Sequence, residues 1–129
     1  MSPAQKSPTP RTQRKSLGKQ GEQMVAEALQ AQGFQILERN LRDRGGELDL
    51  IAVRDTTLWI VEVKAHTRKR SEGVTISVFQ QRRIMRMAYQ YLTRLQTPVQ
   101  HISFTLAVVA FGVEPPEVTF IEHAFESTF

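Results

Sequence analysis

Apolar positions recur along the chain with two different periods, and these periods predict its helices and strands. From Leu17 to about Gln32, apolar residues fall on one helical stripe, which predicts a first helix that ends near Gly33. Ser77 and Gln80 have the spacing of a capping box that opens a second helix. That helix is predicted by a stripe at three-four spacing, formed by Ile84, Met87, Ala88, Tyr91, Leu92 and Leu95.

The remaining segments have the apolar content of strands. Phe34, Ile36 and Leu41 indicate a first strand, which ends before a turn at Arg44-Gly45-Gly46. Four further strands are expected at 47–53, 58–64, 102–111 (buried on both faces) and 118–121 (short). The order αβββαββ predicts an α/β fold with a mixed central sheet.

The loop between the second and third strands fixes their register. A loop of two or four residues gives antiparallel partners whose numbers sum to 111, as for Val53 opposite Leu58. This register sets Asp49 opposite Glu62, and Glu47 opposite Lys64, on one face of the sheet. The other face carries Leu48, Leu50, Ala52, Trp59, Val61 and Val63. Because apolar residues occupy both faces, helices are expected to cover both.

Two facing carboxylates repel each other unless a cation or a proton lies between them. A hard divalent cation such as Mg²⁺ suits this arrangement, because it binds a few carboxylate oxygens and keeps waters for substrate phosphates. Lys64 lies close enough to stabilise negative charge beside such an ion. The alternative is a structural salt-bridge cluster in which Lys64 pairs with Glu47 or Glu62.

Composition divides the chain into a basic tail, 1–16, and one domain, 17–129. The tail has four basic residues and no acid, and its Ser, Thr, Pro and Gln content predicts disorder. The chain has no cysteine, which excludes disulfides and thiolate zinc sites and is compatible with a reducing cytoplasm. No apolar run is long enough to span a bilayer, so we expect a cytoplasmic protein without a membrane partner.

Between Lys64 and Arg94 there are eight basic residues and one acid, Glu72. Such a basic side is typical of a phosphate-binding surface, although a solvated helix face is an equally common origin. The residues expected to contact nucleic acid phosphates are Arg42, Arg44, Arg68, Lys69, Arg70, Arg82 and Arg83.

Taken in order, these motifs resemble a known family. From about residue 17 onward the chain is similar to the YraN-type family of small bacterial proteins. The matching motifs are Gly21-Glu22 with Ala26, the run from Arg44 to Ile51, Val61-Glu62-Val63-Lys64, Val108-Val109-Ala110-Phe111 and Ala124-Phe125.

That family looks like the PD-(D/E)xK nucleases, especially archaeal-type Holliday junction resolvases. The resemblance implies a restriction-endonuclease-like αβββαβ core, with Asp49 and Glu62 as metal ligands and Lys64 as the catalytic lysine. Glu22 is implied as a further acid; its helical stripe also points it toward the sheet, where a buried carboxylate needs a partner. The alternative partners for Glu22 are backbone amides or Arg39.

The expected function is therefore a metal-dependent endonuclease that hydrolyses DNA phosphodiester bonds, with Mg²⁺ or Mn²⁺ as cofactor and with junctions or repair intermediates as candidate substrates. Two alternatives stay open: a non-catalytic nucleic-acid-binding module and an RNA-processing nuclease. Junction enzymes usually act as two-fold dimers, so a homodimer is one expected arrangement.

Overall fold

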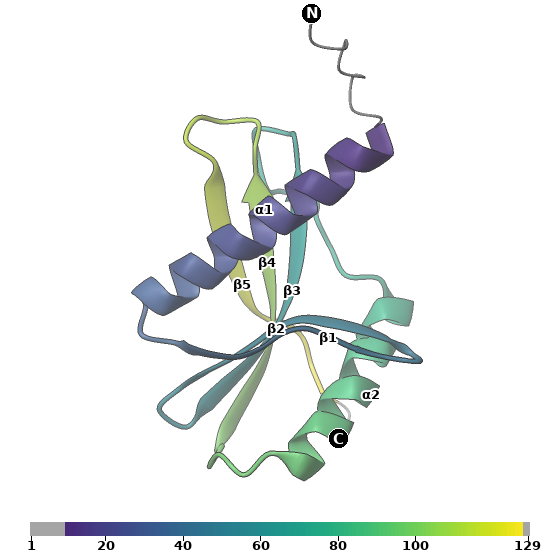
Figure 1. Cartoon of the computed structure of the whole chain (residues 1–129), viewed down its shortest axis with the longest axis vertical. Coiled ribbons are helices and arrows are strands. Elements are labelled where there is room, and N and C mark those ends of the chain that lie inside the picture. The colour runs from purple at the N-terminus through teal and green to yellow at the C-terminus, as the bar shows by residue number, and fades with distance from the viewer. Residues whose placement is uncertain (1–9, 128–129) are drawn as a thin grey trace, which may run out of the picture.

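The computed structural model describes residues 10–127, so the first nine residues of the predicted tail lie outside the described part. Two helices and five strands follow in the order expected from the sequence (Figure 1). They are α1 (Pro10–Ala31), β1 (Gln35–Asp43), β2 (Gly46–Arg54), β3 (Thr57–His66), α2 (Val78–Arg94), β4 (His101–Ala110) and β5 (Glu117–Phe125). Within residues 10–127, neither helix combines the length and apolar character needed to cross a lipid bilayer.

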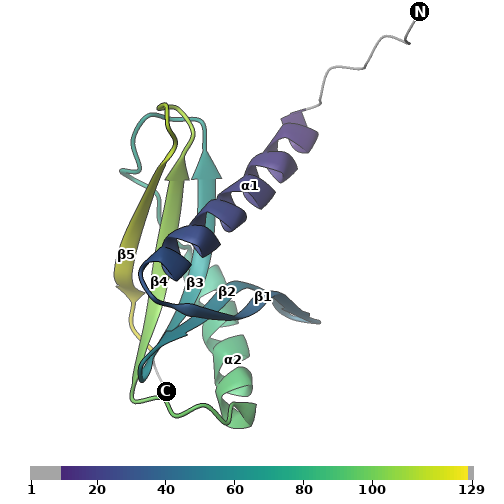
Figure 2. The same ribbon diagram turned by 60° about the vertical axis from the view of Figure 1, so that its left-hand side comes forward.

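The five strands form one mixed sheet in the order β1-β2-β3-β4-β5. β3 and β4 are parallel and are joined through α2, whereas the other neighbouring strands are antiparallel. α1 and α2 lie on opposite faces of the sheet (Figures 1 and 2). The predicted α/β class and the αβββαβ order with an added last strand are therefore confirmed.

Each face of the sheet has its own apolar core, as predicted. Val25, Ala26 and Leu29 of α1 pack against Leu50, Ala52, Trp59, Val61, Ala107 and Val109. On the other face, Ile84, Met87 and Ala88 of α2 pack against Ile51, Val53, Leu58, Ile60, Phe104, Leu106 and Val108. β4 contributes to both cores, in agreement with the prediction that it is buried on both faces.

α1 begins earlier than predicted and ends where predicted. It starts at Pro10 rather than Leu17, so residues 10–16 of the expected disordered tail belong to the helix. Proline fits a first helical turn and the segment is rich in Arg, Gln and Lys, which favour helix without burial. At the other end, Gly33 has a φ of 91° and the Phe34 amide donates to the Leu29 carbonyl at 3.0 Å. This is a Schellman end, which glycine favours.

The predicted register of β2 and β3 is correct near their turn and ends sooner than expected. Val53 pairs with Leu58 and the ladder ends at Leu50 opposite Val61, so Asp49 and Glu62 are not ladder partners. β2 instead continues its pairing with β1 as far as Gly46, and the β1–β2 hairpin bends away from β3 (Figure 2).

This bend changes the face to which Leu48 belongs. Leu48 packs in the α2 core rather than beside Leu50, so its predicted face is wrong. Alternation of side chains assigns faces only while a strand keeps its direction, and β2 does not.

β5 is longer than the predicted segment 118–121. It continues to Phe125, whose ring stacks on Phe104 with centroids 4.7 Å apart. An irregularity at His123, with a φ of 51°, interrupts the apolar alternation, and the His123 amide donates to the Ser103 hydroxyl at 2.9 Å. The bulge kept the strand from being recognised in the sequence.

Candidate active site

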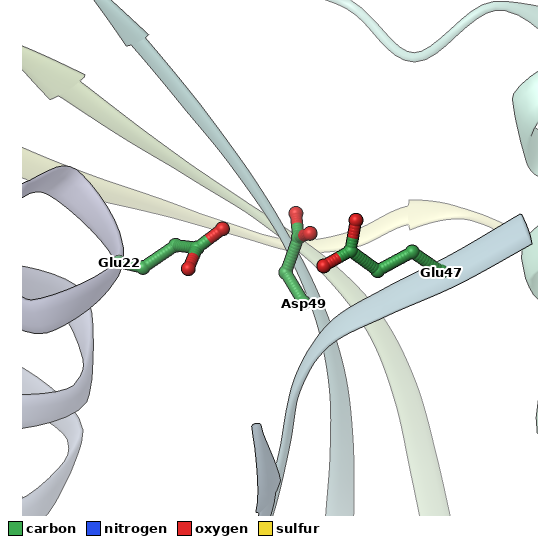
Figure 3. Close-up of side chains that lie close together, drawn as sticks. All are labelled: Glu22, Glu47 and Asp49. Atoms are coloured by element: carbon green, nitrogen blue, oxygen red, sulfur yellow. The ribbon is translucent and has the colours of Figure 1, made fainter. Parts of the chain in front are cut away.

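Three carboxylates meet where the β1–β2 hairpin bends away from β3. Glu22 comes from α1, and Glu47 and Asp49 come from β2 (Figure 3). One oxygen from each side chain lies within 4.8 Å of the others, and all three residues are half-buried. We call these three residues the acid cluster. Glu22 and Asp49 were predicted site residues, whereas Glu47 was expected only to face Lys64.

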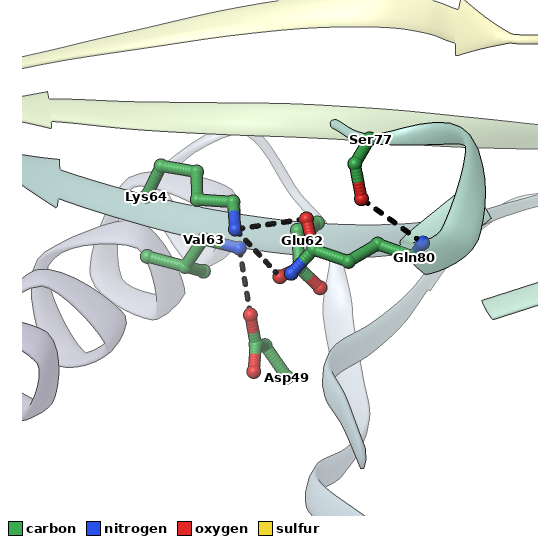
Figure 4. A network of polar contacts seen from close by, with 6 residues as sticks. All are labelled: Asp49, Glu62, Val63, Lys64, Ser77 and Gln80. Atoms are coloured by element: carbon green, nitrogen blue, oxygen red, sulfur yellow. Dashed lines mark hydrogen bonds and ion pairs between the residues drawn. The ribbon is translucent and has the colours of Figure 1, made fainter. Parts of the chain in front are cut away.

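Asp49 is held by the backbone of β3. Its Oδ2 accepts a hydrogen bond from the Val63 amide at 2.8 Å (Figure 4). In a continued ladder that amide would face Leu48, so the carboxylate satisfies a donor that the end of the ladder leaves free. Burial, reinforced by the negative charge of Glu62, raises the pKa of Asp49 to about 8. The bond from Val63 opposes this rise and is too weak to cancel it.

Glu62 and Lys64 lie beside the acid cluster on β3. The Lys64 Nζ is 3.6 Å from the Glu62 Oε1 and donates a hydrogen bond of 3.2 Å to the Gln80 Oε1 (Figure 4). Burial raises the pKa of Glu62, although the charge of Lys64 acts in the opposite direction. Lys64 therefore pairs with Glu62, one of its two expected partners in a salt-bridge cluster, and not with Glu47.

The beginning of α2 supplies a side chain to this site. Ser77 caps the helix as predicted and accepts from the Gln80 amide at 3.2 Å. The Gln80 side chain, however, bonds to Lys64 rather than to the cap (Figure 4), so only half of the capping box forms. The capping motif located the helix correctly but did not indicate that Gln80 also contacts Lys64.

Glu22 has a partner that the sequence did not indicate. Burial raises its pKa, Glu47 raises it further, and a side-chain hydrogen bond from Asn40 lowers it. The predicted alternative partner, Arg39, bonds instead to Gln23 at 2.9 Å.

Asn40 lies on β1 opposite Asp49, between the pairs 39↔50 and 41↔48, and has a φ of 52°. Asparagine is among the few residues that adopt this left-handed conformation readily.

Glu47 and Asp49 of the acid cluster, together with Glu62, line a pocket whose opposite wall is formed by α2. This pocket has a volume of about 200 Å³ and is lined by Glu47, Asp49, Glu62, Gln80, Arg83 and Ile84. Glu22 lies behind these acids on the α1 side, where it lines a second hollow with Asn40 and Lys19. The structure thus brings together all four residues predicted for catalysis and metal binding: Glu22, Asp49, Glu62 and Lys64.

Of the seven predicted phosphate-binding residues, one lines this pocket. Arg83 lines it, and its Nε donates to the Gly45 carbonyl at 2.6 Å. Arg42 forms an ion pair of 3.6 Å with Glu47, which belongs to the acid cluster. The other five are exposed and do not line the pocket: Arg44 in the β1–β2 turn, Arg68, Lys69 and Arg70 in the loop after β3, and Arg82 on α2.

The donor set fits a hard divalent cation. Ligand oxygens on one Mg²⁺ at about 2.1 Å can be at most about 4.2 Å apart, so small side-chain movements would bring the acid cluster within range. The cluster contains only oxygen donors, and burial makes its negative charge costly without a cation.

Comparison with known proteins identifies the family of the chain. The model of uncharacterised protein family UPF0102 matches residues 21–111, which include all four acids and Lys64. A UPF0102 protein of Geobacter metallireducens is 32% identical over 117 residues, covering 89% of this chain and 96% of that protein. A UPF0102 protein of Symbiobacterium thermophilum is 43% identical over 98 residues (74% and 83%). One of Chlorobium chlorochromatii is 48% identical over 79 residues, covering 60% of this chain and 61% of that protein. The chain belongs to the uncharacterised protein family UPF0102, the YraN-type family that its motifs resemble.

Proposed function

We propose that this protein is a metal-dependent endonuclease that hydrolyses phosphodiester bonds in nucleic acid, DNA in particular, with Mg²⁺ or Mn²⁺. One observation carries the proposal: the oxygens of Glu22, Glu47 and Asp49 converge within 4.8 Å, beside the Glu62–Lys64 pair. Oxygen ligands can hold a divalent ion that binds a phosphate, and a neighbouring lysine can stabilise the negative charge that develops on the phosphate oxygens during hydrolysis.

The acids are the residues that would hold the ion. Asp49 and Glu62 share the pocket, and Glu47 and Glu22 approach Asp49 from its other sides. A bound divalent ion would polarise the phosphodiester and lower the pKa of the attacking water. The raised pKa of Asp49 means that, without a cation, this carboxyl carries a proton near neutral pH. The site is therefore suited to exchanging a proton for a metal ion.

Lys64 would stabilise the charge that builds up on the phosphate during cleavage. Its ammonium group is held from one side by Glu62 and from the other by the side-chain amide oxygen of Gln80. A positive group fixed in this way stabilises a transition state without further reorganisation. Gln80 is thus a positioning residue for Lys64.

The test compares cleavage by the parent chain and by Lys64→Ala in EDTA, in magnesium and in manganese. Substrates are duplex DNA, a branched DNA junction, single-stranded DNA and RNA. We expect metal-dependent cleavage by the parent and a loss of about 10²-fold or more in Lys64→Ala, with affinity for the substrate nearly unchanged. Arg94→Ala, which removes one positive charge from the far end of α2, is the matched control and should cleave normally.

The substrates separate the alternatives. Cleavage of RNA alone would identify the RNA-processing nuclease. Binding of nucleic acid without cleavage in either metal would refute the nuclease proposal in favour of the non-catalytic binding module.

A further inference from the structure

The first turn of α2 exposes two neighbouring apolar side chains beside the pocket. Val78 is 60% exposed and Phe79 is 70% exposed, the largest value among the exposed large apolar side chains of the described residues. Gln80, the next residue, and Arg83, one turn later, line the pocket that contains the acids. Phe79 therefore lies at the rim of the candidate active site and takes no part in either core.

Arg83 links Phe79 to the pocket and to the β1–β2 turn. Its guanidinium carbon is 5.6 Å from the centroid of the Phe79 ring, within the range of a cation–π contact. Its Nε donates to the Gly45 carbonyl at 2.6 Å. Gly46 leaves the room that this arginine needs, because a Cβ at that position would come within 2.7 Å of the Arg83 guanidinium. Phe79 consequently lies beside a positive charge that is hydrogen-bonded to the β1–β2 turn.

The charge of α2 indicates what kind of partner this surface fits. The helix contains four arginines and no aspartate or glutamate. An apolar protein surface placed on Phe79 would bury Arg83 without a counter-charge, which is costly. A nucleic acid strand matches both the charge and the exposed ring of this surface, because its phosphates neutralise arginines and its bases stack on aromatic rings.

We propose that Phe79, flanked by Val78 and Arg83, stacks against an unpaired base of a nucleic acid strand whose neighbouring phosphate enters the acid pocket. This inference rests on the proposed function for the location of the phosphate. Inside a continuous duplex the faces of a base are covered by its neighbours, so away from the duplex ends an exposed ring can stack only on a base that is unpaired or displaced. The substrate class is accordingly single-stranded or branched nucleic acid rather than continuous duplex.

The experiment measures binding of labelled oligonucleotides by fluorescence anisotropy in EDTA, so that no cleavage takes place. It compares a single strand, a blunt duplex and a duplex with a single-stranded branch. Phe79→Ala should weaken binding to the single strand and to the branched duplex by roughly 5-fold to 100-fold, the effect of losing one stacked base. Binding to the blunt duplex, which depends on phosphate contacts, should not change. Phe79→Trp should restore or increase affinity for the single strand.

Tyr89→Ala is the matched control, because it also removes an exposed aromatic ring from α2 but lies outside the acid pocket lining. It should leave all three affinities unchanged. The proposal is overturned if Phe79→Ala keeps the parent's affinity for single strands, if it weakens all three substrates equally, or if the parent binds none of them. The binding assay contains no divalent metal and is independent of the cleavage assay. If Phe79 passes the binding test and no cleavage is found with magnesium or manganese, the proposed function is refuted, whereas the stacking of a base on Phe79 stands.

Discussion

Replacing the ionisable carboxyl of Asp49 by a neutral amide should make the metal-free protein more stable, by an amount that depends on pH. Asp49 has a pKa of about 8 in the folded chain, against 3.8 for an aspartate in an unperturbed setting. Because the folded value is the higher one, the unfolded state loses its proton first, and the free energy of unfolding falls as pH rises from about 4 to about 8. The carboxyl group of Asp49 therefore contributes most favourably in acid and least favourably in alkali.

The magnitude follows from the proton that the folded state keeps. At pH 7 the pH is about three units above the unfolded pKa, and each unit corresponds to about 1.4 kcal/mol, so retaining the proton costs on the order of 4 kcal/mol. The amide side chain of the Asp49→Asn variant does not titrate, and its oxygen can still accept the hydrogen bond from the Val63 amide. We expect a gain of roughly 2–4 kcal/mol for Asp49→Asn near pH 7, and almost none near pH 4.

Urea denaturation of parent and variant at several pH values in EDTA measures this difference. Asp55→Asn is the matched control, because Asp55 is exposed in the β2–β3 turn and its φ of 54° also suits asparagine. Magnesium should then stabilise the parent and not Asp49→Asn, since only the parent binds the ion. A gain that stays constant across the pH range, or that also appears in Asp55→Asn, would show that the Asp49 carboxyl is not the source of the pH dependence.

Three further changes and one control variant test other parts of the structure. Asn40→Gly keeps the left-handed backbone but removes the hydrogen bond to Glu22. Calorimetry should find Mg²⁺ affinity lowered by about 10-fold to 100-fold, with little change in the metal-free unfolding temperature. Equal affinity in parent and variant would exclude a positioning role for Asn40. Replacing all three basic residues of 68–70 by Ala should reduce the slope of log affinity against log salt for duplex DNA by up to about 2.7, and an unchanged slope would place phosphate binding elsewhere. Gly112→Ala places a Cβ against the backbone of the loop after β3 and should cost about 1–3 kcal/mol in urea denaturation. Gly18→Ala has open space and should not destabilise the chain.

The sequence was sufficient for most of the fold because the relevant signals are local. The stripe from Ile84 to Leu95 and the short loop after Val53 depend only on nearby residues, and both identified their elements correctly. The boundaries of α1 and β5 were missed for different reasons. Helix can extend through polar residues without burial, and a bulge at His123 hides a strand that continues beyond it.

The candidate site was predictable only as far as the register of β2 and β3 holds. Lys64 and Glu62 are two residues apart on one straight strand, so their proximity could be read directly. Glu47 was missed as a member of the acid cluster because extrapolating the register beyond Leu50 ignores the bend of β2. The left-handed backbone of Asn40 leaves no mark in an isolated sequence, since asparagine is also common in turns.

The position of the acids between two helices on opposite faces of the sheet has a mechanical consequence. Glu22 moves with α1 and Gln80 moves with α2. Asp49 lies on β2 beyond the point where its pairing with β3 ends. No single rigid element therefore fixes the distances between these three residues. A change in how α1 rests on its core would therefore alter the distance of Glu22 from Asp49, and a change in how α2 rests on its core would move Gln80, which holds Lys64. Each core thus controls a different part of the site: a cavity made by shortening Leu29 would shift Glu22, and one made by shortening Met87 would shift Gln80 and with it Lys64.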